Sequence, residues 1–156
     1  MWGVEHMAML ISFGFLAAWL AYNRKWFWVA VALITQVPFW VGAYMSIETA
    51  NASPANLNII LNVTLSGILV SFAEKLQEQG RGAMALTWLC ILFLGLTSVD
   101  VWHLVSPFNS YFLVQEAGHY LALLIIGGRA YVNRRAHGIV RNSMYPRGSG
   151  QGGGLV

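Results

Sequence analysis

The chain has 156 residues, of which 57% are hydrophobic and only 10% are charged. Soluble domains carry about a quarter charged residues, so a water-soluble fold of this length could not bury so much apolar surface. The composition excludes an ordinary soluble domain and favours one compact bundle in a lipid bilayer. The length leaves no room for a separate soluble catalytic domain beside such a bundle.

Five apolar stretches follow one another, each close to the length of about 20 residues that a helix needs to cross a bilayer. They cover residues 4–22, 26–46, 54–74, 84–105 and 107–130. We therefore predict an all-α fold, an integral membrane bundle of about five transmembrane helices. Ser53-Pro54 and Ser106-Pro107 are typical of a helix N-cap followed by proline in the first turn, and they predict the starts of the third and fifth helices.

The basic residues indicate the orientation of this bundle. All nine Lys and Arg residues lie after the first or third apolar stretch or from the end of the fifth onward, which places them on one side if the helices alternate. Because basic segments stay in the cytoplasm, we expect the N-terminus outside and the C-terminus cytoplasmic, with a bacterial inner membrane as the location. Residues 1–132 form the predicted transmembrane domain, and residues 133–156 a basic, Gly-rich cytoplasmic tail. The same placement argues against a nucleic-acid partner.

Ionisable residues within the apolar stretches form two acid-x-x-His pairs. Asp100 and His103 lie near the outer end of the fourth stretch, and Glu116 and His119 lie deeper in the fifth. Residues three apart share a helix face, so each pair points in one direction. Ionisable groups in mid-membrane are costly and are functional candidates by default, which directs attention first to Glu116 and His119.

These two pairs predict a metal site made of Asp100, His103, Glu116 and His119. Carboxylate and imidazole suit a divalent transition metal such as zinc, iron or manganese, and acid-x-x-His from facing helices is how di-metal bundles present their ligands. Such a site needs more carboxylates than these, with Glu5 and His6 as possible extras. Haem is less favoured, because His119 is more than a turn deeper than the shallow histidines.

Simpler interpretations stand beside the metal site. His6 and His103 could be solvated at the interface, and Glu116 with His119 could form a structural hydrogen-bonded pair. Asn58, Asn62 and Ser66 recur at every fourth residue and predict a polar stripe that faces other protein instead of lipid. This stripe suits contacts between helices better than a binding surface.

Three functions follow from these features. The first is a small accessory or assembly subunit of a larger membrane complex, partnered by the bilayer and by other subunits or a second copy. The second is a membrane metal-binding, possibly redox, protein, and the third is a proton or ion pathway or a phage holin-like protein. No nucleophile with an adjacent base is visible, so the sequence assigns no reaction. Cys90 stands alone, which excludes an intrachain disulfide.

Overall fold

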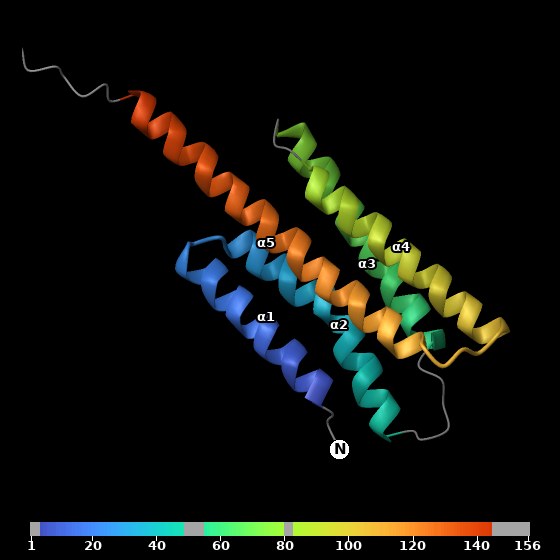
Figure 1. The fold of residues 1–156 in the computed structure, drawn as a ribbon. Coiled ribbons are helices and arrows are strands. Elements are labelled where there is room, and N and C mark those ends of the chain that lie inside the picture. Colours follow the sequence, from blue (N-terminus) through green and yellow to red (C-terminus); the bar gives the residue numbers. More distant parts are fainter. Residues whose placement is uncertain (1–3, 49–54, 80–82, 145–156) are drawn as a thin grey trace, which may run out of the picture.

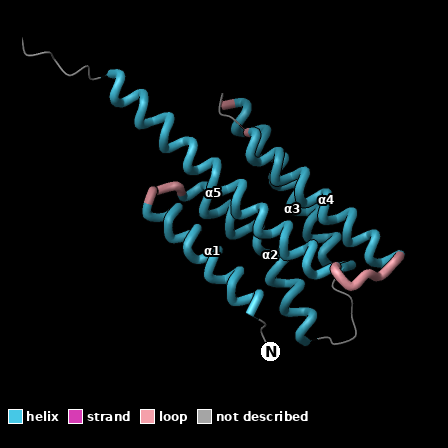
Figure 2. The backbone as a smooth tube through the Cα atoms, viewed as in Figure 1, coloured by secondary structure: helices cyan, strands magenta, loops and turns pink. Residues whose placement is uncertain are grey.

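The computed structural model describes residues 4–48, 55–79 and 83–144, and every regular element in these ranges is a helix. The prediction of an all-α fold is confirmed. The helices are α1 (Val4–Tyr22), α2 (Trp26–Glu48), α3 (Ala55–Glu78), α4 (Met84–Val105) and α5 (Tyr111–Met144). Figures 1 and 2 show them as one elongated bundle in which the short connections leave neighbouring helices antiparallel.

The predicted helix boundaries hold for α1 and α4 and are wrong for α5, which starts at Tyr111 instead of Pro107. The amide of Phe108 donates to Nδ1 of His103 at 3.4 Å, so this segment is held as a loop. The first turn of α5 closes when the Val114 amide bonds the Ser110 carbonyl at 3.1 Å. The residues predicted to start the third helix, 53 and 54, lie outside the described residues.

The fifth helix also continues beyond the predicted transmembrane segment. Its last described residue is Met144, so the first part of residues 133–156 extends α5, and the remainder lies outside the described residues. Figure 1 shows this end of α5 projecting past the other helices.

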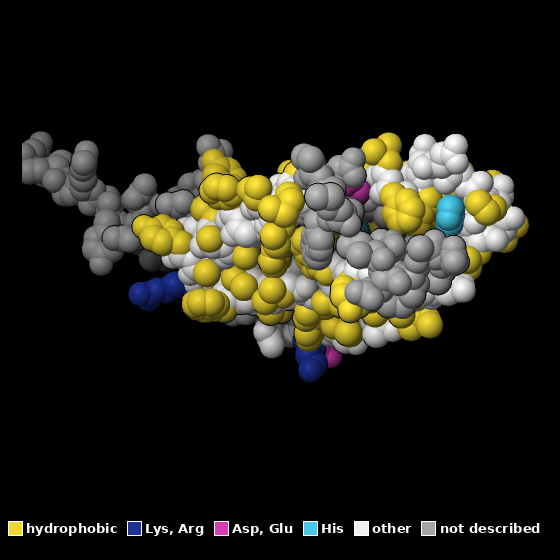
Figure 3. Space-filling model, turned by 90° about the horizontal axis from the view of Figure 1, so that it is seen from below, with side chains coloured by type: hydrophobic (Ala, Val, Ile, Leu, Met, Phe, Trp, Pro, Cys, Tyr) yellow, Lys and Arg dark blue, Asp and Glu magenta, His cyan; other side chains and the backbone are white. Residues whose placement is uncertain are grey.

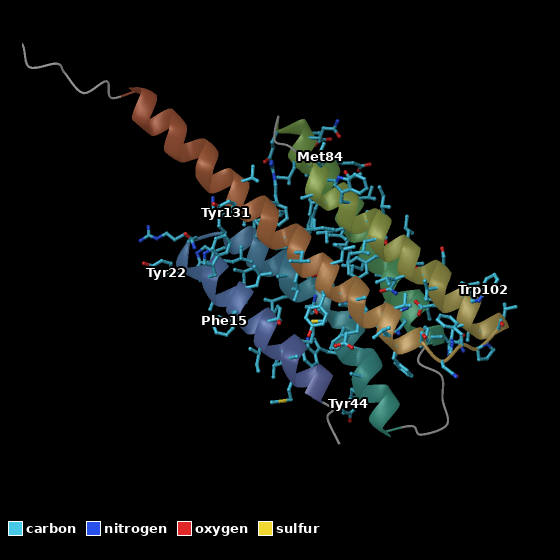
Figure 4. The ribbon with its side chains drawn as sticks, viewed as in Figure 1. Phe15, Tyr22, Tyr44, Met84, Trp102 and Tyr131 are labelled. Atoms are coloured by element: carbon cyan, nitrogen blue, oxygen red, sulfur yellow. The ribbon has the colours of Figure 1, made fainter. Side chains whose placement is uncertain are left out.

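Two helix hairpins and one central helix make up the bundle. The α3 and α4 helices make the most extensive contact, whereas α1 packs against α2 and α5. Because α5 contacts both α2 and α4, it joins the two hairpins. The labelled side chains show the alternation of helix ends: Tyr22, Met84 and Tyr131 lie toward one end, and Tyr44 and Trp102 toward the other (Figure 4).

Apolar residues fill the interior and also cover the outside. Leu86, Phe93 and Ile126 are fully buried in the core, while Phe15 is 76% exposed on the surface. Figure 3 shows apolar side chains spread over much of one face of the bundle. A molecule that is apolar on both sides of its helices suits lipid, because lipid and not water is then the solvent of the outer face.

Within the described residues, three helices are long and apolar enough to cross a membrane. They span Trp26–Tyr44, Ala55–Glu78 and Met84–Val105, and α1 offers a shorter apolar stretch, Met7–Tyr22. These lengths and compositions indicate a membrane protein. The α5 helix differs because its first half carries Gln115, Glu116 and His119.

Candidate functional site

A buried carboxylate lies at the centre of the polar residues. Asp100 of α4 is 0% exposed, and its Oδ1 accepts hydrogen bonds from the Tyr111 hydroxyl at 2.6 Å and from Gln115 Nε2 at 2.7 Å. Its Oδ2 accepts a third from Asn62 Nδ2 at 3.0 Å. All three donors are neutral, and they come from α3 and α5. Since a carboxylate is tolerated inside a protein only when hydrogen-bonded, these donors account for its burial.

We call Asp100, Asn62, Tyr111 and Gln115, with Asn58, the Asp100 network. Asn58 joins it because its Nδ2 donates to the Tyr111 hydroxyl oxygen at 3.3 Å. The network therefore connects three helices through one carboxylate and one phenol. Asp100 and Tyr111 lie close to the loop at 106–110 that joins α4 to α5, so the network lies at one end of the bundle.

His103 supports this end of the network without touching the carboxylate. Its ring stacks on the Tyr111 ring with centroids 4.0 Å apart and planes at 15°. Its Nδ1 accepts the Phe108 amide, which shapes the loop that leads into α5. The histidine thus orients Tyr111 and helps to fix where α5 starts. These contacts differ from those of a freely solvated histidine, which was the simpler interpretation of the sequence.

The predicted polar stripe on α3 is confirmed as an inward face. Asn58, Asn62 and Ser66 are all buried. The Ser66 hydroxyl returns to its own helix, where it donates to the Asn62 carbonyl at 2.8 Å. The stripe thus supplies two side-chain amides to the Asp100 network and one internally satisfied hydroxyl.

His119 occupies a separate, deeper position on α5. It is 2% exposed, and its ring lies between those of Phe39 and Phe93, with centroids 5.3 and 5.6 Å away. It also makes a hydrogen bond with the backbone of Thr35. This carbonyl lies three residues before Pro38, which lacks the amide that would bond the Ile34 carbonyl, so α2 has one internal hydrogen bond fewer in this turn.

Glu116 and His119 do not form the hydrogen-bonded pair that their spacing allowed. The Nδ1 of His119 has no partner in the described part of the chain, and its other nitrogen faces α2. Glu116 is half-buried at the side of α5, while His119 turns inward. Aromatic packing of the imidazole, together with the carbonyl near Pro38, outweighs contact with the neighbouring acid.

The four predicted metal ligands therefore occupy different surroundings. Asp100 is hydrogen-bonded to amides and a phenol, His103 stacks on Tyr111, and His119 packs between two phenyl rings. Within the residues that the structure describes, no three His, Cys, Asp or Glu side chains gather closely enough to hold a metal ion. The side chains of the extra candidates, residues 5 and 6, lie outside those described. A metal at these residues stays a prediction.

Tyr111 and Gln115 are the members of the site that are not among the candidates predicted from the sequence. One signal was available, because the two residues are four apart and share a face of α5, directly after a short turn from Asp100. No protein family, curated protein or solved structure matches this chain. Its function is therefore inferred from its own residues alone.

Proposed function

We propose that this protein is a five-span membrane protein, with its N-terminus outside and its C-terminus in the cytoplasm of a bacterium. In this proposal it serves as an accessory or assembly subunit that binds a transmembrane helix of another subunit. The alternation of helix ends supports the topology, because it places all the basic connections at one end. The polar interior and one groove on the surface support the role of an accessory or assembly subunit.

The Asp100 network is better suited to structure than to chemistry. Both carboxylate oxygens accept hydrogen bonds from within the bundle, and Asp100 itself is fully buried. Hydrogen bonds of this kind between helices stabilise a bundle in lipid, where burial of apolar surface contributes little. The network therefore holds α3, α4 and α5 in one arrangement, and an interaction role falls to the outer surface.

The observation that carries this proposal is a groove where α1 meets α5. Its volume is about 390 Å³. The lining residues combine small and bulky side chains: Ser12 and Leu16 from α1, and Tyr120, Leu123, Leu124, Gly127 and Gly128 from α5. Small residues in a groove let a second helix backbone approach closely, and hydroxyls can donate to that helix.

A transmembrane helix fits this groove better than a lipid chain does. A side chain at Gly128 would meet nothing within 4 Å, so the backbone of α5 is open to the groove at this point. Ser12 and Tyr120 add hydroxyl groups at its wall, which an acyl chain cannot use. Small residues such as Gly127 and Gly128 are enriched where helices associate in membranes.

Photo-crosslinking in the native membrane tests this proposal. A photoreactive amino acid at Leu124, which lines the groove, should give an adduct with one distinct membrane protein, and the same group at Ile60 on α3 should not. Both positions are exposed, at 71% and 62%. Gly128→Leu should abolish the Leu124 adduct by filling the groove. Gly95→Leu is the matched control, since that glycine is also open and lies on α4.

Three results would overturn the proposal. Adducts with lipid alone would mean that the groove holds an acyl chain. Adducts that persist in Gly128→Leu would mean that the partner binds elsewhere. Adducts whose mass is a multiple of this chain would replace the other subunit by a second copy.

A further inference from the structure

Several buried side chains of α2, α3 and α5 carry polar atoms without a protein partner in the described part of the chain. Among these atoms are both amide atoms of Gln36, the Oδ1 atoms of Asn58 and Asn62, and His119 Nδ1. Each of these side chains is at least nine-tenths buried, at 8% exposure or less. Buried polar atoms in native proteins are almost always hydrogen-bonded to protein or to ordered water, so this group needs an explanation.

The helix levels place three of these side chains at the same depth. A Cβ at Gly42 of α2 would lie 3.0 Å from Asn58 Oδ1, so these two residues face each other. Because α2 and α3 are antiparallel and rise equally per residue, Gln36 lies between the levels of Asn62 and Ser66. His119 reaches the same level, since it bonds the backbone of Thr35, the residue before Gln36.

The mixture of donors and acceptors identifies the ligand. A metal cation would satisfy the oxygens and His119 Nδ1 but would leave the Gln36 Nε2 donor without an acceptor. An anion has no hydrogen to donate, so it would leave these acceptor atoms without a partner. Water donates and accepts, and it needs two to four polar partners at such a site. The missing amide of Pro38 adds a further acceptor, the Ile34 carbonyl, in the same part of α2.

We propose that the seam between α2, α3 and α5 binds a small cluster of water molecules, held by Gln36, Asn62 and His119. Asn62 also donates to Asp100, so the cluster extends the Asp100 network to His119. Two ionisable residues on different helices then belong to one chain of hydrogen bonds. This inference is independent of the partner proposed for the α1/α5 groove.

Water-to-protein magnetisation transfer in solid-state NMR tests the cluster in lipid bilayers. With His6→Gln and His137→Gln, the ¹⁵N-labelled histidines are His103 and His119, and the signal that is lost in His119→Gln identifies His119. We expect rapid transfer from water to its imidazole, as for wild-type His103, which is partly exposed. The methyl groups of Leu86 and Leu89, both 0% exposed in the apolar core, give the dry reference. Transfer to His119 as slow as to these leucines would overturn the proposal.

A second measurement uses the sign of a stability change. Gln36→Leu removes two polar atoms at similar volume. If water is bound, the substitution leaves that water short of partners, so the melting temperature should fall and the transfer to His119 should be lost. A rise in melting temperature would mean that Gln36 is buried dry, and the cluster would be ruled out. Gln79→Leu, at an exposed position on the turn after α3, is the control and should leave both readouts unchanged.

Discussion

The Tyr111 hydroxyl donates a 2.6 Å hydrogen bond to Oδ1 of Asp100, and this bond joins the first turn of α5 to the end of α4. The same tyrosine accepts from Asn58 and stacks on His103, so three helices and the loop at 106–110 meet at one phenol. These contacts explain why α5 begins at Tyr111, because the first residue of the helix is the one that is hydrogen-bonded to the buried carboxylate.

Tyr111→Phe tests the strength of this connection. The substitution keeps the ring on His103 but removes a donor from a buried carboxylate, and hydrogen bonds to charged groups contribute about 1.5–3 kcal/mol. We expect a loss of that size in unfolding free energy, measured by denaturation in detergent. Tyr44→Phe, at a 57% exposed ring on α2, should change nothing. Equal stability of the two variants would show that the Asp100 network contributes nothing to holding the bundle.

The inward amide of Asn62 predicts a second stability effect. Asn62→Leu should destabilise the bundle by roughly 0.5–2 kcal/mol, since it removes a hydrogen bond between helices in an apolar environment. Asn56→Leu on the exposed side of the same helix is the control. Asn62 and Gln115 share Asp100 as a partner. The stability loss of the double variant Asn62→Leu/Gln115→Leu should therefore differ from the sum of the two single losses by about 0.5 kcal/mol or more in a thermal-melt series. Strict additivity would contradict a shared partner.

The sequence predicts the helices better than it predicts their contacts. The bounds of α1 and α4 follow from unbroken apolar stretches, and the inward face of α3 follows from the four-residue spacing of Asn58, Asn62 and Ser66. The start of α5 does not, because a serine–proline pair is compatible with a cap and equally with a loop. The side-chain contacts of His103 with the Phe108 amide and of Tyr111 with Asp100 decide between them.

In the candidate site, too, the sequence predicts which residues matter better than it predicts their contacts. The sequence identifies Asp100 as an ionisable residue near the outer end of an apolar stretch, but not its burial or its partners. The partner of a side chain depends on helix rotation and depth, which spacing along one helix does not contain. Glu116 and His119 share a face by sequence, yet His119 packs between two phenyl rings and Glu116 stays at the edge. The proximity of the Thr35 backbone of α2, with which the imidazole makes a hydrogen bond, could not be inferred from α5.

Close packing between α4 and α5 makes Gly118 sensitive to substitution. A Cβ there would lie 2.6 Å from Cδ2 and 2.9 Å from Cδ1 of the buried Leu96. Gly118→Ala should therefore cost about 1–3 kcal/mol through overpacking, as measured by thermal denaturation. Adding Leu96→Val should recover part of this loss. Gly67→Ala, on a surface with nothing within 4 Å, should be neutral or slightly stabilising.

Cysteine labelling tests the proposed five-span topology. On a Cys90→Ser background, a cysteine at Asn109 in the α4–α5 loop should react with an impermeant reagent in intact cells. A cysteine at Gln79, after α3, should react only after permeabilisation. Both positions are exposed and lie at opposite ends of α4. Labelling of position 79 in intact cells would contradict the orientation that the basic residues predict.

The metal prediction is tested by elemental analysis of the purified protein beside its folded yield. A site that uses Asp100, His103, Glu116 and His119 predicts zinc, iron or manganese in the wild type, lost in His119→Ala and kept in His137→Ala. His103→Ala should lose the metal only if the ligands include the end of α4. Packing alone predicts a different pattern: no metal in any variant, and a loss of about 2–4 kcal/mol in His119→Ala, because the ring between Phe39 and Phe93 leaves a cavity. Metal retained at full occupancy in His119→Ala would exclude this histidine as a ligand.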